Sequence, residues 1–346
     1  MQSKRIGYID AMRGLTMILV VYSHITFQCL GNVDIAFNDF FMRFRMPLFF
    51  FISGWVFFKA ERIWEGKTIQ SVLRKKFMVQ IIPFSIFFLL FLYVHDSIDV
   101  KYLGSEKHGY WFTFVLFEFF VLYVLLAFFF QRKAGNKKGD WKMFVSILFI
   151  SIISFYYSAN YSRYEYELGY VKVFLGFFSF VKLWYFIFFW FGTFVRKYFD
   201  CFVSFTENQH FMAVVIVLFV FVTVFPEVYS MNGFEYIAYL FTGICGIIML
   251  FTFFRRRADL FSQDTRIGFS LQYIGRRTLD IYLLHYFFLP YHLKWLGDIL
   301  HVYENNIMGA LLAFSLALVV IAISLFVSEM LRLSPFLAHY LFGAKR

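Results

Sequence analysis

This 346-residue sequence has few charged residues for its length. Asp, Glu, Lys and Arg together make up 16% of it, against about 25% in an average soluble domain, while hydrophobic residues make up 61%. The mean hydropathy is +0.66. No polar stretch approaches the roughly 50 residues that a small soluble domain needs. These values exclude an ordinary water-soluble globular protein and an appended soluble module.

Cysteine and proline are also scarce. Cys29, Cys201 and Cys245 are odd in number and widely spaced, which argues against a disulfide framework and against a zinc site. There are only five prolines, and we find no internal repeat, low-complexity tract, glycine-rich nucleotide loop or cluster of metal ligands. We therefore expect a single integral membrane domain over residues 1–346, with no metal.

What the sequence does contain is a series of apolar runs. A helix of about 20 residues crosses a hydrocarbon core of about 30 Å, and most of these runs are long enough to do so. The pattern predicts an all-α protein, a polytopic membrane bundle of about ten transmembrane helices. The runs lie near residues 9–29, 40–58, 77–94, 110–130, 143–158, 183–195, 210–228, 236–254, 278–297 and 306–330.

The basic residues predict the orientation of these spans. A net charge of +11 is compatible with nucleic-acid binding, but the charges are spread through short loops beside the spans, and the positive-inside rule is a sufficient explanation. We therefore expect no nucleic-acid partner, and a multi-pass protein of the bacterial inner membrane with both termini cytoplasmic. Only six basic residues then face the opposite side: Lys101, Lys107, Arg163, Lys172, Lys182 and Lys294.

The first apolar run contains three ionisable residues, Asp10, Arg13 and His24. Such residues within a span are costly and usually functional. Arg13 and His24 are eleven residues apart, which returns to nearly the same helical face about 16 Å further along the axis. Together with Met17 and Gln28 they form one stripe, and we expect this stripe to face protein or a cavity.

The chemistry of these side chains suggests their roles. Arg13 is a permanent cation that needs a carboxylate or a bound anion, and Asp10, three residues earlier, is a candidate partner. His24 can accept a proton from a hydroxyl near neutral pH if one ring nitrogen is free. In the second run, Arg43 can reach the membrane surface, whereas Arg45 lies deeper; we expect at least one of the two to point inward and bind substrate.

Four segments resemble the membrane-bound acyltransferase-3 family. Residues 5–14 read RIGYIDAMRG, and the Arg-x10-His spacing to His24 follows. Residues 44–54 read FRMPLFFFISG and resemble the family's second-span signature. Residues 110–112 read YWF, and residues 274–285 read IGRRTLDIYLLH, similar to the fourth-span start and the penultimate-span motif. The matches occur in order and cover essentially the whole chain.

The resemblance implies transfer of an acyl group, usually acetyl, from cytoplasmic acyl-CoA to a hydroxyl of an exported or cell-surface glycan. It implies that His24 is the catalytic histidine and Arg13 its companion. The family often carries Arg-x-x-Arg before the third-span proline, implicated in CoA binding. This chain has Arg74-Lys75-Lys76 instead, with Phe77 and Gln80 at the corresponding spacings before Pro83.

The negative phosphates of CoA suit cationic side chains. Arg74, Lys75 and Lys76 are our first choice for binding the acetyl-CoA donor, with Arg255, Arg256 and Arg257 as rivals, and positive-inside topology explains both clusters equally well. Either Arg13 or Arg45 is suited to stabilise the oxyanion, and direct transfer and a covalent acyl-histidine both remain open.

Other residues within the apolar runs are expected to bind the acceptor or to neutralise charge. Trp111 and His285 are candidates for binding the acceptor, although His285 is equally compatible with simple packing. Three further carboxylates are expected to neutralise Arg13, Arg43 or Arg45, because buried charges are usually paired. These carboxylates are Glu118, Asp280 and Glu329.

The sequence therefore predicts an O-acyltransferase that acts on a carbohydrate or lipid-linked glycan within the lipid bilayer. The main alternative is a transporter of a glycan or lipid-linked sugar, because charged stripes and broken helices also line translocation paths. A transporter of this kind should show an inverted repeat and no dependence on acyl-CoA. We find no such repeat in the sequence.

Overall fold

A computed structural model describes residues 5–31, 38–60, 62–95, 107–131, 137–160, 174–225, 235–302 and 306–344. Throughout these ranges the regular structure is helical and there is no strand. The all-α prediction is confirmed.

Seven helices in these ranges are long and apolar enough to cross a membrane. An eighth span results if α9 (Phe199–Glu207) and α10 (Gln209–Val224), which meet at 82°, are counted as one. Two of the ten apolar runs predicted from the sequence do not correspond to any of these helices, for two different reasons. Residues 9–29 carry Asp10 and Arg13, and residues 278–297 are divided among short helices. The protein is a multi-pass membrane protein, and ten is an approximate count of its spans.

The chain forms two compact units. Unit 1 comprises residues 1–52 and 199–331, and unit 2 comprises residues 53–198 and 332–346. The division falls inside α2 (Asn38–Phe57). The organisation of residues 1–346 as one domain stays a prediction.

Unit 1 is built around α1 (Gly7–His24), which continues into a π-helical turn, Ile25–Cys29. Met12, Met17, Val21 and Ile25 are fully buried, so the helix has the apolar surroundings expected of an interior element. The other helices of the unit are α12 (Glu235–Arg256), α13 (Arg266–Arg276), α14 (Thr278–Leu284), α15 (Lys294–Val302) and α16 (Asn306–Arg332), together with α9 and α10.

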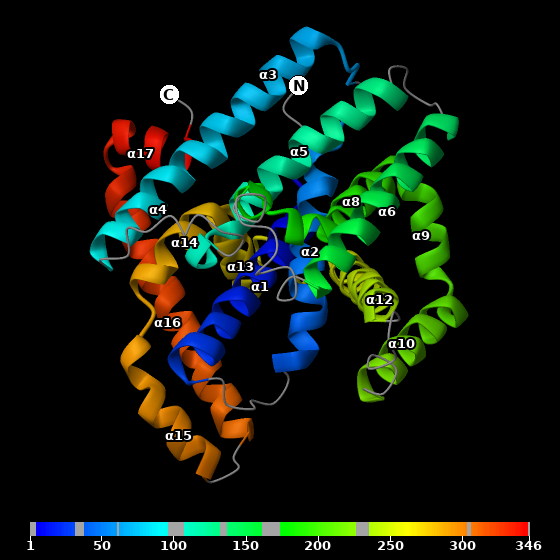
Figure 1. The fold of residues 1–346 in the computed structure, drawn as a ribbon. Helices are drawn as coiled ribbons and strands as arrows, with labels where there is room; N and C mark the ends of the chain where they lie inside the picture. Colours follow the sequence, from blue (N-terminus) through cyan, green and yellow to red (C-terminus); the bar gives the residue numbers. More distant parts are fainter. Residues whose placement is uncertain are drawn as a thin grey trace. The chain divides into compact units, whose positions relative to one another are not determined.

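In unit 1, α1 packs against α13 (Figure 1). Two glycines, one on each helix, lie at this contact. A Cβ atom on Gly14 would lie 2.0 Å from the carbonyl oxygen of Leu271, and one on Gly275 would lie 1.8 Å from that of Asp10. Neither position has room for a side chain. Small residues allow membrane helices to approach this closely, and the contact fixes α13 and the segment that follows it against α1.

Unit 2 contains a continuous 29-residue helical rod, residues 66–94, visible as α3 and α4 in Figure 1. It consists of α3 (Gly66–Lys76), a π-helical turn Phe77–Ile81, and α4 (Ile82–Val94). The other helices are α5 (Trp111–Phe130), α6 (Lys137–Ala159), α8 (Phe186–Lys197) and α17 (Pro335–Phe342). Buried Asp140 joins α6 to α8, because it accepts hydrogen bonds from Lys197 Nζ at 2.6 Å and from the Tyr198 hydroxyl at 2.5 Å.

Candidate functional site

Two histidines and a tyrosine meet inside unit 1. The ring centroids of His24 and His285 are 5.3 Å apart, and the Tyr286 ring lies 5.0 Å from His24 and 4.0 Å from His285. His24 is at the end of α1, whereas the other two residues follow α14. His285 and Tyr286 are buried and His24 is half-buried. The structure thus brings together two of the residues singled out from the sequence.

Both ring nitrogens of His24 have polar neighbours. Nδ1 lies 3.2 Å from Nε2 of Gln28, and Nε2 lies 3.0 Å from the hydroxyl of Tyr286. Gln28 belongs to the π-helical turn, which changes the helical phase directly after His24. Single π-helical turns occur often at functional sites. Gln28 and Tyr286 therefore orient the imidazole from opposite ends.

His285 has a defined tautomer. Its Nδ1 lies 3.0 Å from the carbonyl oxygen of Ile281, and because a carbonyl only accepts, Nδ1 carries the proton and donates. In the neutral ring, Nε2 is then an acceptor. It is fully buried and has no hydrogen-bond partner within the described residues. A buried acceptor of this kind calls for a donor such as a hydroxyl group.

A polar network attaches α14 to α16 and so positions His285. The Ser328 hydroxyl donates to Asp280 at 2.5 Å, and Arg277 Nη2 lies 2.7 Å from Oε1 of Glu329. Arg277 also lies 3.8 Å from Asp280. Both Asp280 and Glu329 thus have an ion pair with Arg277, a residue that the sequence-based expectation of partners for Arg13, Arg43 and Arg45 did not include.

Glu118, the third of these carboxylates, lies in α5 of unit 2. Neither of its oxygens has a hydrogen-bond partner in the part of the chain that the structure describes.

Arg13 and Asp10 lie toward the opposite end of α1 from His24. Their side chains form an ion pair at 3.8 Å, as expected from the three-residue spacing. Eleven residues of α-helix separate Arg13 from His24 by about 16 Å along the axis. This separation favours Arg45 over Arg13 as the cation nearest the imidazole, and Arg45 is indeed close enough to His24 for their charges to interact. Arg43 is half-buried on the same helix, α2.

The first-choice CoA residues, Arg74, Lys75 and Lys76, end α3 in unit 2. Arg74 and Lys75 are exposed and line a depression of about 440 Å³. Lys76 points elsewhere, because its Nζ lies 3.9 Å from the centroid of the Phe120 ring and makes a cation–π contact. Only two of the three residues are therefore presented to a ligand on this surface.

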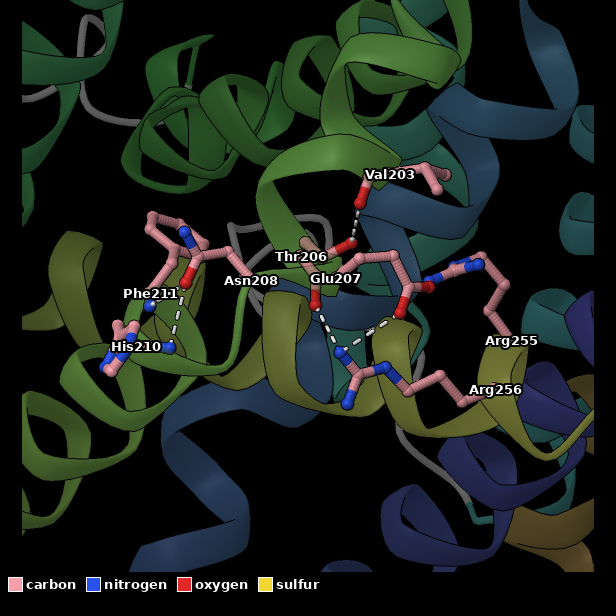
Figure 2. Close-up of polar contacts among 8 residues, drawn as sticks. All are labelled: Val203, Thr206, Glu207, Asn208, His210, Phe211, Arg255 and Arg256. Carbon is pink, nitrogen blue, oxygen red and sulfur yellow. Dashed lines mark hydrogen bonds and ion pairs between the residues drawn. The ribbon is translucent and has the colours of Figure 1, made fainter.

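The rival cluster is largely occupied by structural contacts (Figure 2). Arg255 forms an ion pair with Glu207, and Arg256 Nη2 lies 3.3 Å from Glu207 Oε2 and donates to the Thr206 carbonyl at 2.7 Å. The Arg255 hydrogen bond lowers the pKa of Glu207 from its ordinary value. These contacts tie the end of α9 to the end of α12, so they explain two of the three arginines without a ligand. Arg257 is exposed.

Figure 2 also shows how the bend after Glu207 is made. The side chain of Asn208 accepts hydrogen bonds from the backbone N–H groups of His210 at 2.9 Å and Phe211 at 3.3 Å. Asn208 is thus the N-cap of α10. The cap starts a new helix directly after α9 ends.

Trp111 is the first residue of α5, in unit 2. Its ring stacks on Tyr185, with centroids 5.9 Å apart, and Lys182 Nζ lies 5.0 Å from its centroid. The indole is half-buried. An aromatic face beside a cation is compatible with the predicted acceptor-binding role.

Comparison with known protein families identifies the family of this chain. No curated protein and no solved structure matches the chain significantly. The family model described as an acyltransferase domain matches residues 6–329, and so covers the histidine pair in unit 1 and nearly all of unit 2. The chain is therefore a membrane-embedded acyltransferase and belongs to the acyltransferase-3 family.

Proposed function

We propose that this enzyme transfers an acetyl group from cytoplasmic acetyl-CoA to a hydroxyl of a cell-surface or exported carbohydrate, free or lipid-linked. The observation that carries the proposal is the site around His24. An imidazole held by Gln28 and Tyr286 lies beside a second imidazole with an open, buried acceptor nitrogen. This arrangement suits removal of a proton from an alcohol, once the alcohol replaces the neighbour at the ring nitrogen of His24 that accepts the proton.

The reaction uses these groups in a defined order. The acceptor hydroxyl attacks the thioester carbonyl, a C–O bond forms, and its proton passes to His24. Collapse then breaks the C–S bond, and the imidazolium returns the proton to the departing CoA thiolate. The negative charge that develops on the carbonyl oxygen needs a nearby donor, and we assign this role to Arg45, whose charge interacts with His24.

His285 gives the acceptor a second anchor. Its Nε2 is a buried acceptor without a hydrogen-bond partner among the described residues, so a hydroxyl that donates to it supplies the missing hydrogen bond. We assign this nitrogen to a hydroxyl of the carbohydrate. Tyr286 contacts both histidine rings and is assigned to positioning them rather than to the reaction itself.

The proposed location is the bacterial inner membrane, with both termini on the cytoplasmic side. The distribution of basic residues along the sequence supports this orientation. It places the start of α1, where Asp10 and Arg13 lie, toward the compartment that supplies acyl-CoA.

The test compares cells that express the wild-type protein with cells that express His24→Ala at the same level. Surface and exported glycans are analysed for O-acetyl esters after feeding labelled acetate. The proposal expects esters with the wild type and none with the variant. Equal ester content would contradict it. A change in the amount of exported glycan, with unchanged ester content per glycan, would favour the transporter alternative.

A further inference from the structure

A cavity of about 320 Å³ opens beside the first turn of α1. Three segments of unit 1 build it: the start of α1, the turn after α12, and α13. Its lining contains both polar and apolar side chains and includes two arginines. The lining residues are Arg5, Gly7, Tyr8, Asp10, Ala258, Phe261, Ser262, Gln263, Gln272 and Arg276.

The cavity carries an excess of positive charge. Asp10 interacts electrostatically with three arginines, Arg5, Arg13 and Arg276, and its ion pair is with Arg13. Neither Arg5 nor Arg276 forms an ion pair or a side-chain hydrogen bond with any residue in the described ranges. One carboxylate therefore faces three guanidinium groups, and two of these remain available to an anion. Guanidinium groups bind phosphate well because they donate two parallel hydrogen bonds.

The wall opposite α1 is held in place by two glutamines. Nε2 of the buried Gln272 donates to the Phe261 carbonyl at 2.6 Å, and Nε2 of Gln263 donates to Oε1 of Gln272 at 3.3 Å. These bonds fix the turn after α12 against α13. The cavity therefore has a defined shape before any ligand binds, which lowers the entropic cost of binding.

The cavity and His24 are joined by a single rigid element. Asp10 lines the cavity, and fourteen residues of α1 separate it from His24, about 21 Å along the axis. A ligand that has its charge at one end and its reactive carbon at the end of a long arm matches this separation. A compact anion such as free phosphate does not.

We propose that this cavity binds the phosphate-bearing end of the acyl-CoA donor, with Arg5 and Arg276 as the phosphate ligands. The inference rests on the proposed function and moves the donor site away from Arg74, Lys75 and Lys76. The depression beside those residues is lined only by α3 and the turn that follows it. The cavity beside α1 is lined by three segments and adjoins the helix that carries His24.

The experiment uses purified full-length protein and two donors. Acetyl-CoA carries the phosphates, whereas S-acetylpantetheine has the same thioester and arm without them. Initial rates are measured with both donors for the wild type, Arg5→Gln, Arg276→Gln and the double variant. The matched control is Arg266→Gln, which removes an exposed arginine from the same helix, α13, outside the cavity. Arg74→Gln tests the rival site.

For each cavity variant we expect KM for acetyl-CoA to rise about tenfold or more, with kcat nearly unchanged, because a charge-assisted contact to phosphate is lost. Rates with S-acetylpantetheine stay at the wild-type level, which also shows that the variants are folded. Arg276→Lys keeps the charge and recovers part of the affinity.

Two outcomes overturn different statements. Suppose first that the wild type transfers acetyl, so that the enzyme acts as proposed. The cavity then does not bind the phosphates if Arg74→Gln is the only variant that raises KM for acetyl-CoA. It also does not bind them if the cavity variants lower the rates with both donors equally. If the wild type uses neither donor, the proposed function itself is contradicted.

Discussion

The Nε2 atom of His24 lies 3.0 Å from the hydroxyl oxygen of Tyr286, a residue 262 positions further along the chain. The contact is possible because α13 packs directly on α1 and because Arg277, Asp280, Ser328 and Glu329 fix the next segment. The site therefore depends on a few packing and polar contacts, and each can be tested.

Removal of the Tyr286 hydroxyl should leave the His24 imidazole in place but less firmly oriented. For Tyr286→Phe we expect kcat to fall about tenfold, the effect of one lost hydrogen bond of about 1.4 kcal/mol. The apparent pKa in the kcat profile should also move, which a purely structural effect would not cause. Steady-state rates across pH provide both values. Tyr156→Phe, on an exposed side chain, should leave the profile unchanged; an identical profile for Tyr286→Phe would contradict the positioning role.

His285 should act on the acceptor and leave donor binding unchanged. His285→Phe removes the free Nε2 and retains a ring, so we expect KM for the acceptor to rise about tenfold, from the loss of one hydrogen bond. KM for acetyl-CoA should stay constant. Kinetics with each substrate varied in turn separate these values. His210→Phe changes an exposed histidine and serves as the control. Equal KM values for the acceptor would show that His285 only packs.

The crossing of α1 and α13 should not tolerate a methyl group. Gly275→Ala places a Cβ against the Asp10 carbonyl, and we expect a loss of about 1–3 kcal/mol in the free energy of unfolding, as for other overpacked sites. Gly66→Ala is the matched control, since its Cβ would meet nothing within 4 Å. Thermal unfolding in detergent measures both. Similar melting temperatures for the two variants would disagree with the close approach.

The ion pairs that Glu207 forms with Arg255 and Arg256 should weaken in acid. Because its hydrogen bond to Arg255 lowers the pKa of Glu207, the folded state holds the carboxylate more strongly than the unfolded chain does. The resulting stability is present above the ordinary glutamate pKa, about 4.3, and is lost as the pH falls through the lowered value. Melting temperatures of the wild type and Glu207→Gln should therefore converge at low pH and separate near neutrality. A difference in melting temperature that stays constant across this pH range would contradict a stabilising role for the Glu207 ion pairs.

Much of this protein follows from its sequence. The apolar runs predict the helices because hydrocarbon requires long stretches without charge, and His24 and His285 stand out because histidine is rare in such runs. The separation of Arg13 from His24 also follows from helical rise alone.

The remaining features could not be predicted, for identifiable reasons. Tyr286 is one of 23 tyrosines, and nothing local marks it as the neighbour of His24. The π-helical turn that presents Gln28 has no sequence signature. The contacts of Arg255 and Arg256 depend on Glu207, which lies about 50 residues earlier and is not adjacent in any sequence pattern. For Tyr286 and Glu207 the missing information is a long-range contact, whereas the π-helical turn is local and has no sequence marker.

The central claim is that His24 handles the proton of the acceptor, and its most direct test is single-turnover acetyl transfer by purified wild type and His24→Gln, with donor and acceptor both saturating. Release of the CoA thiol and formation of the ester are followed together. We predict a decrease in the transfer rate of about 10²–10⁴-fold with an unchanged melting temperature. A His24→Gln enzyme that is folded and transfers acetyl at the wild-type rate would contradict the account.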